Sequence, residues 1–357
     1  MKKISLAFVL LLHACGHSET SPVINNKEES APQYALSDAE ILASNLSIPW
    51  DIAKKEDTFY ISERAGQIIQ IQKNGQKTNM KLTLTKDISH EGEGGLLGFE
   101  LDPQFQSNSL AYVYHTYKEG ETVYNRIVQV EMKNNEWVET KELLASIPGG
   151  RIHNGGRLAI GPDQTLYATA GDAGIKENAQ NLDSLSGKIL RLNLDGTIPN
   201  DNPFPQSYVY SWGHRNPQGL AWSDNGTMFA SEHGQTAHDE INLIRPGKNY
   251  GWPIIEGDEK KAGMETPLFH SGDETWAPSG MAYDEGRLYV ATLAGQKLLT
   301  FDLENRKVTS LVEEAGRLRD VMIENNQLYL LTNNTDGRGT PKPDDDHLVK
   351  IDLSKSK

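Results

Sequence analysis

The most reactive combination of residues in this chain is a histidine placed among arginines and glycines, in the segment 151–157 (Arg-Ile-His-Asn-Gly-Gly-Arg). Histidine changes its charge near neutral pH, so it is the side chain best suited to take a proton from a substrate hydroxyl. The two glycines carry no side chain and let a ligand approach the backbone closely. We therefore expect His153 to act as a general base; the alternative is a histidine that makes only structural hydrogen bonds.

Other charged, polar or aromatic residues stand at comparable places along the chain, directly before or after short apolar segments. They are Glu91, Glu93, Arg151, Asp172, His214, Arg215, Asn216, Glu232, His233, Trp276, Arg317, Arg319, Asn333, Asn334 and Asp336. Arginine can donate two parallel hydrogen bonds to a carboxylate, so several arginines gathered in an acidic chain predict an anionic ligand.

Two neighbouring segments are rich in oxygen ligands around glycine bends, namely 232–240 (Glu-His-Gly-Gln-Thr-Ala-His-Asp-Glu) and 249–253 (Asn-Tyr-Gly-Trp-Pro). Backbone carbonyls and carboxylates at such bends can bind Ca²⁺. The Asp-x-Asp-x-Asp-Gly loop is absent, so composition alone leaves calcium open. Zinc is not expected, because the His-Glu-x-x-His motif and cysteine ligands are both missing.

The segments around these residues repeat. A turn, an apolar residue with Tyr or Phe, and small or β-branched residues follow one another in six places. These are residues 58–62, 110–114, 166–169, 228–231, 288–292 and 328–332. An apolar segment precedes each copy, and a segment with alternating apolar residues, typical of a half-buried strand, follows it.

Six ordered units of three or four strands predict an all-β fold, a six-bladed β-propeller with four-stranded antiparallel blades. A β-sandwich or two sheet domains would not explain six copies in one order. The last unit is short, so we expect residues 39–42 to pair with it as an outer strand and close the ring. In a propeller, loops before first strands and after second strands surround one channel mouth, where the residues above would converge.

Composition excludes other classes of function. The 357 residues include 35 Lys and Arg against 49 Asp and Glu, a net charge of −14. Nucleic-acid binders neutralise phosphates with Lys and Arg, so we expect no nucleic-acid partner. A single cysteine excludes a disulfide scaffold. Hydrophobic residues make up 37% of the chain, which is enough for a large folded core.

The N-terminus predicts export. Residues 1–14 combine two lysines, an apolar run too short to span a bilayer, and a small residue before Cys15, like a bacterial lipoprotein signal. Residues 15–33 are polar and predict a tether, so the folded domain would be 34–357. We expect an extracytoplasmic lipoprotein, on the outer membrane facing the periplasm or exported, with Cys15 lipidated. The alternative is ordinary secretion with Cys15 idle.

Several of these segments resemble the soluble pyrroloquinoline-quinone (PQQ)-dependent sugar dehydrogenases, the glucose/sorbosone dehydrogenase family. They are residues 91–99, 153–158, 187–193, 213–220, 239–242 and 249–253. The resemblance covers about residues 38–353 and implies a six-bladed propeller, in agreement with the repeats.

The resemblance implies that an aldose is oxidised at its anomeric hydroxyl to a lactone, with an external acceptor taking the electrons. His153 would take the proton while hydride passes to PQQ, and Arg215 would stabilise negative charge on the quinone oxygen. Asn216, Arg317 and Arg319 match cofactor-binding positions of the family.

Calcium is also implied by the resemblance. Gly234 and Gln235 match the pair whose carbonyls hold an active-site Ca²⁺ that touches PQQ, and Asp239 lies in the same turn. Glu240 and Tyr250 match carbonyl ligands of a second, structural Ca²⁺.

The chain departs from the glucose dehydrogenase pattern at four positions. Glu93 replaces a substrate-contacting Gln, His233 replaces a Gln beside the calcium carbonyls, Asn333 stands near an Asp position, and Ala294 takes roughly the place of a cofactor-binding Lys. We expect Glu93 and Trp276 to contact substrate, and His233 and Asn333 to contact the cofactor. Shorter loops at 174–186 and 257–275 predict an open pocket and an aldose dehydrogenase of broad specificity.

Two alternatives remain open from the residues themselves. One is a Ca²⁺-dependent lactonase or other hydrolase on a propeller, since a fold does not determine a function. The other is a non-catalytic binding propeller. The sequence leaves the sugar, the electron acceptor and the oligomeric state undetermined.

Overall fold

The structure, a computed structural model, describes residues 34–355. The predicted signal peptide (1–14), Cys15 and the remainder of the 15–33 tether lie outside the described residues. The helices of residues 34–355 are short. They are α1 (Phe105–Asn108) and the 3-10 helices η1 (Leu36–Asp38), η2 (Lys176–Gln180) and η3 (Leu353–Lys355). In the described part of the chain, no helix has the length and apolar character needed to cross a membrane.

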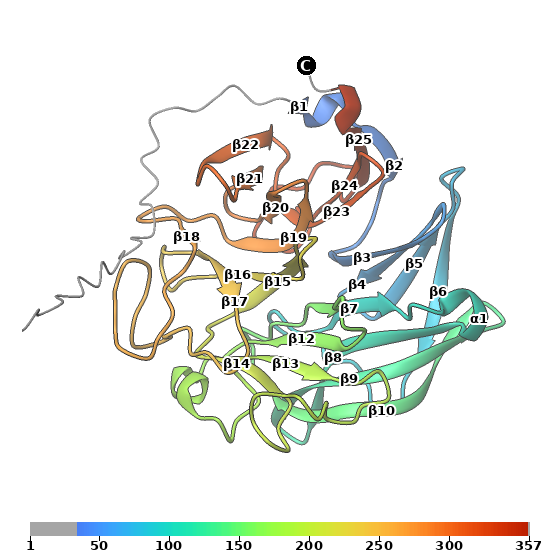
Figure 1. Ribbon diagram of the computed structural model, residues 1–357. Coiled ribbons are helices and arrows are strands. Elements are labelled where there is room, and N and C mark those ends of the chain that lie inside the picture. The colour runs from blue at the N-terminus through green and yellow to red at the C-terminus, as the bar shows by residue number, and fades with distance from the viewer. Residues whose placement is uncertain (1–33, 356–357) are drawn as a thin grey trace, which may run out of the picture.

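Most strands of residues 34–355 form antiparallel meanders in which consecutive strands lie side by side (Figure 1). One parallel pairing, between the strands 77–83 and 136–148, joins the first two meanders into an eight-stranded sheet. Meander 1 comprises β3 (Pro49–Lys55), β4 (Thr58–Glu63), β5 (Gln67–Ile71) and β6 (Lys77–Thr83), and meander 2 comprises β7 (Leu96–Leu101), β8 (Leu110–Glu119), β9 (Thr122–Lys133) and β10 (Glu136–Pro148). Meander 3 comprises β11 (Leu158–Ile160), β12 (Leu166–Ala170), β13 (Lys188–Leu192) and β14 (Val209–Trp212).

Meander 4 comprises β15 (Pro217–Trp222), β16 (Met228–Glu232), β17 (Glu240–Ile244) and β18 (Phe269–His270), and meander 5 comprises β19 (Pro278–Asp284), β20 (Arg287–Thr292), β21 (Leu298–Asp302) and β22 (Val308–Glu313). Meander 6 comprises β23 (Leu318–Glu324), β24 (Gln327–Thr332), β25 (Leu348–Asp352) and the N-terminal β2 (Glu40–Ala43). The repeated sequence segments correspond to the first, second and third strands of the meanders, which confirms the strand prediction.

The N-terminal strand completes the last meander. β2 pairs antiparallel with β25, with Glu40 opposite Lys350 and Ile41 opposite Val349, so the expected pairing of residues 39–42 is confirmed with a shift of one residue. The short β1 (Tyr34–Ala35) pairs in parallel with β22. A segment from the start of the chain thus covers the edge that β25 would otherwise expose.

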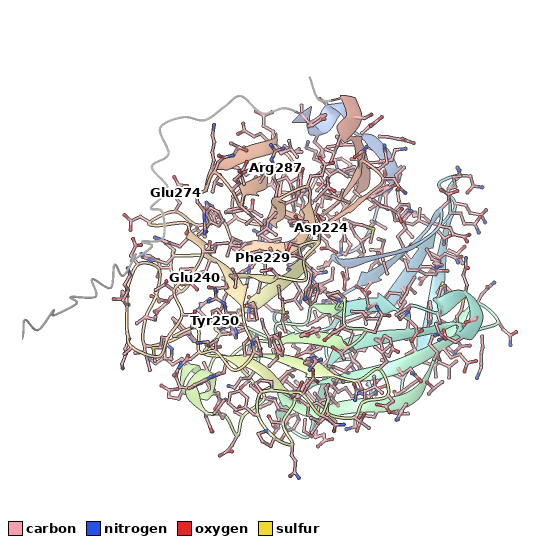
Figure 2. The ribbon with its side chains drawn as sticks, in the orientation of Figure 1. Asp224, Phe229, Glu240, Tyr250, Glu274 and Arg287 are labelled. Carbon is pink, nitrogen blue, oxygen red and sulfur yellow. The ribbon has the colours of Figure 1, made fainter. Side chains whose placement is uncertain are left out.

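The meanders surround a common centre. First strands contact one another in the cycle β3, β7, β11, β15, β19, β23 and back to β3. In Figure 1 the chain runs around this centre from blue through green and yellow to red, and side chains occupy the spaces between the sheets (Figure 2). The arrangement is all-β and propeller-like.

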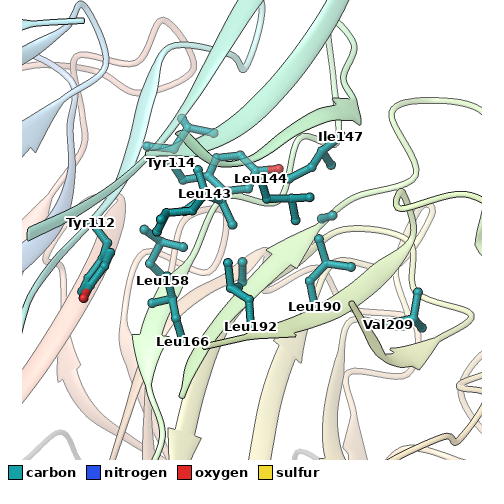
Figure 3. Packing of buried hydrophobic residues seen from close by; sticks show 14 of the residues in the cluster. Tyr112, Tyr114, Leu143, Leu144, Ile147, Leu158, Leu166, Leu190, Leu192 and Val209 are labelled. Carbon is teal, nitrogen blue, oxygen red and sulfur yellow. The ribbon is translucent and has the colours of Figure 1, made fainter. Parts of the chain in front are cut away.

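Apolar cores lie between neighbouring meanders. Figure 3 shows Tyr114 and Leu144 of meander 2 packed against Leu158 and Leu190 of meander 3. Each of these side chains is buried. Alternation along the strands places apolar residues on both faces of a sheet, and their burial stabilises the contact by about 25 cal/mol for each Å² removed from water.

The centre of the ring is polar. The Arg157 guanidinium forms a short ion pair with Asp51 of β3 and a second, at 3.1 Å, with Asp320 of β23. Its Nε donates to the carbonyl of Gln218 in β15 at 2.9 Å, and the guanidinium lies 4.4 Å from the ring centre of Trp50. One buried arginine therefore connects three first strands.

Glu100 of β7 lies near this ion-pair cluster. Burial raises the pKa of Glu100 to about 8, with Arg157 opposing the shift and Asp320 adding to it. The folded protein therefore holds a proton there that the unfolded chain releases near pH 4–5. Stability should fall as pH rises from about 5 to about 8, because the unfolded state binds fewer protons in that range.

Glu100→Gln keeps the shape and removes the charge, so it should raise the free energy of unfolding at pH 8 and leave it unchanged at pH 5. Urea denaturation at both pH values measures this difference. Glu119→Gln, at an exposed position of β8, is the control and should show no pH-dependent gain. A Glu100→Gln protein no more stable than wild type at pH 8 would contradict the assignment.

Candidate functional site

The loops at one end of the meanders bring His153 and Asp172 together. Nδ1 of His153 lies 2.7 Å from Oδ1 of Asp172, and Nε1 of Trp252 donates to Oδ2 of the same carboxylate at 2.9 Å. A carboxylate only accepts hydrogen bonds, so the imidazole proton is assigned to Nδ1. Nε2 is then left with a free lone pair, and the side chain stays 14% exposed. This arrangement suits a general base.

The backbone at His153 is strained. Its φ is 56°, in the left-handed region, and its N–H donates to Oε2 of Glu93 at 2.9 Å. Its carbonyl accepts from Ala173 N at 3.1 Å. A Cβ at Gly171 would stand 2.1 Å from that carbonyl oxygen, so glycine is required there. Such strain persists where surrounding contacts impose it, commonly at functional sites.

Glu93 is held between the His153 backbone and an arginine from a distant loop. Arg338 donates to Oε1 of Glu93 at 2.8 Å. Burial alone would raise the pKa of the Glu93 carboxyl, but the His153 N–H and the Arg338 guanidinium lower it below its usual value. Glu93 is therefore ionised at neutral pH and can accept hydrogen bonds.

Arg215 lies on the same side of the molecule as His153. Its carbonyl accepts from the N–H of Asp172 at 2.7 Å, and its guanidinium lies 5.4 Å from the ring centre of Trp252. Nη1 donates to the His233 carbonyl at 3.3 Å, whereas the buried Nε has no partner among the described residues. Asn216 accepts at Oδ1 from the N–H of Gly155, at 3.1 Å.

Further cations lie nearby. Arg319 donates to Gln218 at 2.8 Å, and the amide oxygen of Asn333, when oriented toward it, accepts at 2.9 and 3.1 Å. Burial lowers the pKa of Arg319 to about 9. The charge of Asp336 opposes this shift in part, and the charges of the neighbouring arginines add to it. Arg317 is paired with Asp336 at 2.7 Å. An incoming anion would relieve the unfavourable burial of Arg319.

His233 is half-buried and neutral, and its Nε2 is inaccessible to solvent. Burial lowers its pKa to about 4, and its Nε2 finds no hydrogen-bond partner within residues 34–355. A buried polar atom without a partner is costly, which indicates a ligand atom at this place.

His153 and Arg215 are not lining residues of the nearby pocket, whereas Glu93, His233 and Arg319 are. This pocket has an empty volume of about 500 Å³, part of which is open to solvent. It is lined by Trp50, Arg64, Gly92, Glu93, Asn154, Gly155, Gln218, His233, Leu293, Arg319, Asp336 and Arg338. The sequence candidates omitted Arg64 and Arg338. Arg64 directly follows β4, so the rule that placed residues after second strands at the mouth would have found it. Arg338 lies two residues beyond Asp336 in the long loop between β24 and β25, farther from the strand end than the rule reaches.

The expected calcium bend is built around Asp239. Oδ1 of Asp239 accepts from Gly234 N at 2.9 Å, and Oδ2 accepts from Trp276 N at 2.6 Å and Ala277 N at 2.8 Å. The carboxylate thus shapes the bend through backbone N–H groups. None of the hydrogen bonds within residues 34–355 uses the carbonyl of Gly234 or Gln235. Those two oxygens are therefore available to a cation.

No group of three or more His, Cys, Asp or Glu side chains in the described residues has the geometry of a metal site. Glu240, the first residue of β17, and Tyr250, in the loop that follows β17, are the second expected pair and are labelled in Figure 2. Tyr250 stacks on His214 at 4.8 Å. Burial, together with the charge of Glu232, raises the pKa of Glu240 to about 8.

Trp276 is not brought to the pocket. It is 6% exposed, and its ring packs against Phe301 at 5.5 Å in the core between meanders 4 and 5. Its backbone N–H binds Asp239, and the expectation that Trp276 contacts a substrate stays a prediction. Its position just before a first strand did not reveal which way the side chain points.

Comparison with known proteins decides the family. A family model described as "Glucose / Sorbosone dehydrogenase" matches residues 46–342. The chain belongs to this family. Membership makes it an oxidoreductase of the class that acts on sugar CH–OH groups.

Similar proteins carry related names. The chain is 35% identical to quinoprotein glucose dehydrogenase B of Acinetobacter calcoaceticus, over 63% of this chain and 54% of that relative. It is 30% identical to aldose sugar dehydrogenase YliI of Escherichia coli, over 85% of this chain and 92% of that relative. The PQQ-bound form of an aldose sugar dehydrogenase from Streptomyces coelicolor shares 40% identity and a TM-score of 0.82, covering 87% of this chain and 96% of the other.

The site geometry predicts one tautomer of His153. In wild type, ¹⁵N NMR of the ring should show the proton on Nδ1, where Asp172 accepts it. Asp172→Ala removes the acceptor and should give a mixture of both tautomers. Trp252→Phe, which leaves the carboxylate in place, should keep the proton on Nδ1. A wild-type ring protonated on Nε2 would contradict the assigned arrangement.

Proposed function

We propose that the protein is a PQQ-dependent aldose dehydrogenase, which oxidises the anomeric hydroxyl of an aldose to a lactone with Ca²⁺ at the cofactor site. The observation that carries this proposal is His153, whose Nδ1 is bound by Asp172 and whose chain neighbours Asn154 and Gly155 line a pocket with three arginines. Loss of a proton and a hydride from the sugar requires a positioned base and an acceptor site for two electrons.

The pocket fits an anionic cofactor with several carboxylates. Arg215 Nε and His233 Nε2 are buried without partners among the described residues, and Arg319 is a buried cation with a lowered pKa. Guanidinium groups of this kind bind carboxylates strongly. Arg215, Asn216 and Arg319 would hold the cofactor together with His233, Arg317 and Asn333. Arg317 would act mainly through its charge, because its guanidinium N–H groups already donate to Asp336.

Calcium fits the neighbouring bend. The unengaged carbonyls of Gly234 and Gln235 would bind it, with the bend held in shape by Asp239. We extend the proposal to a second Ca²⁺ at the backbone carbonyls of Glu240 and Tyr250. When bound, PQQ and Ca²⁺ supply a polarised quinone that accepts the hydride.

The protein residues perform the remaining steps. His153 Nε2 takes the proton of the anomeric hydroxyl, and Asp172 keeps the ring oriented and stabilises the imidazolium. Arg215 places positive charge where negative charge develops. The ionised Glu93 accepts hydrogen bonds from sugar hydroxyls at the pocket edge. The short loops leave the pocket open, which favours several aldoses over one sugar.

We infer further that the meanders are the six blades of a closed propeller, supported by the cycle of first-strand contacts. We also propose that the chain is an extracytoplasmic lipoprotein anchored through Cys15, and that an external acceptor removes the electrons.

Two competing functions explain the site less well. A Ca²⁺-dependent lactonase would leave Arg319 and Arg215 without a role, and a binding protein would need no free base at His153.

The activity test uses the full chain reconstituted with PQQ and Ca²⁺, a panel of aldoses and a reducible dye. Wild type should reduce the dye with several aldoses, and chelation of calcium should abolish this. His153→Ala should lower kcat by roughly 10²–10⁴-fold, the usual contribution of a general base. Lactone opening without PQQ would support the hydrolase instead, and full activity in His153→Ala would exclude His153 as the base.

Cofactor binding can be measured separately by titration of PQQ absorbance. Arg319→Met keeps the volume and removes the charge, so Kd should rise by roughly 10- to 100-fold, the equivalent of about 1.5–3 kcal/mol for a charge-assisted hydrogen bond. Arg245→Met is the matched control, because Arg245 pairs with Glu265 at the exposed edge of meander 4. Equal Kd values for the two variants would remove Arg319 from the cofactor site.

A further inference from the structure

Lys188, the first residue of β13, has a completely buried ammonium group that contacts only backbone carbonyls. Its exposure is 0%, and Nζ donates to Asn178 O at 2.8 Å, Ala179 O at 3.2 Å and Ser186 O at 2.8 Å. Burial lowers the pKa of Lys188 to about 7. No salt bridge joins it to a carboxylate within residues 34–355, so nothing of opposite charge offsets its burial.

The three carbonyls belong to the loop 172–186, which connects β12 to β13 and contains η2. Gly187 N donates to Gly171 O at 2.8 Å and joins the two ends of this loop. A Cβ at Gly187 would lie 2.6 Å from Cα of Ala179, so the middle of the loop folds tightly back onto its end. The ammonium fills the space that this fold encloses, as a metal cation fills a carbonyl cage.

The same loop reaches the base by two routes. At its start stands Asp172, the acceptor of His153, whose Oδ1 also accepts from Gly174 N at 2.8 Å. From its middle, Gln180 exchanges two hydrogen bonds with Asn249, at 3.0 and 2.9 Å, and donates to the Trp252 carbonyl at 2.6 Å.

Trp252 closes the second route, because its indole N–H donates to Oδ2 of Asp172. Both oxygens of the carboxylate that orients His153 are therefore bound by groups whose positions depend on the loop 172–186.

We propose that Lys188 is a positioning residue for the reaction: its hydrogen bonds to three backbone carbonyls hold the loop 172–186 in the form that orients Asp172 and Trp252 against His153. The statement about the reaction rests on the proposed function, whereas the statement about the loop does not. If Lys188 only filled space, an apolar side chain of similar length would serve equally well, since replacing a buried charge by a hydrophobic group is often neutral or stabilising.

The test compares Lys188→Met with Lys176→Met, the same substitution at an exposed position of the same loop. Hydrogen exchange of the full chain, with and without PQQ and Ca²⁺, should be faster at residues 172–186 and 248–256 in Lys188→Met only. In the reconstituted enzyme, kcat should fall by roughly 10- to 100-fold with KM nearly constant, as expected when a reacting group is misplaced. Lys176→Met should match wild type in both measurements.

Unchanged exchange in a folded Lys188→Met protein would overturn the proposal, and so would an unchanged kcat. Gln180→Ala keeps the ammonium and cuts the route through Trp252, so it decides the question if Lys188→Met does not fold. It should speed exchange at residues 248–256 and lower kcat, and a wild-type result in both would also overturn the proposal. If wild type itself oxidises no aldose, the exchange data still test the role of Lys188 in the loop.

Discussion

The ion-pair cluster around one buried arginine is the constraint on which the other features depend. Arg157 joins Asp51 and Asp320 from the first and last meanders and also binds the backbone of β15. Breaking such a pair would leave a buried charge without a partner, which is costly. Because these first strands contact one another, the same cluster helps to set where the loops with His153 and Arg215 lie.

The site combines strain with an excess of positive charge. His153 is held in a left-handed conformation by contacts from Glu93 and Ala173, while Arg319 is buried among other arginines. Both arrangements are unfavourable in themselves, and an anion bound at Arg319 would offset the second of them. The stability of the core between the meanders offsets this cost, so the scaffold and the site have separate physical roles.

Much of the architecture could be predicted from sequence. Apolar and polar residues alternate along the strands of a half-buried sheet, and the same sequence pattern recurs in six units. Fourth strands such as β14 and β18 gave no comparable signal, since they are short and lie at the outer edge. The loop rule brought His153, Asp172 and Arg215 to one end, but it also included Trp276, whose ring turned into the core. Arg338 and the ammonium cage of Lys188 depend on loop conformation, which residue types alone do not determine.

The most direct test of the central claim is an anaerobic single-turnover experiment on the full chain with bound PQQ and Ca²⁺. One addition of an aldose should change the absorption of the bound quinone to that of its reduced form, and deuterium at C1 of the sugar should slow the change severalfold. Bound quinone that stays oxidised with every aldose, while the cofactor remains in the pocket, would contradict sugar oxidation at this site.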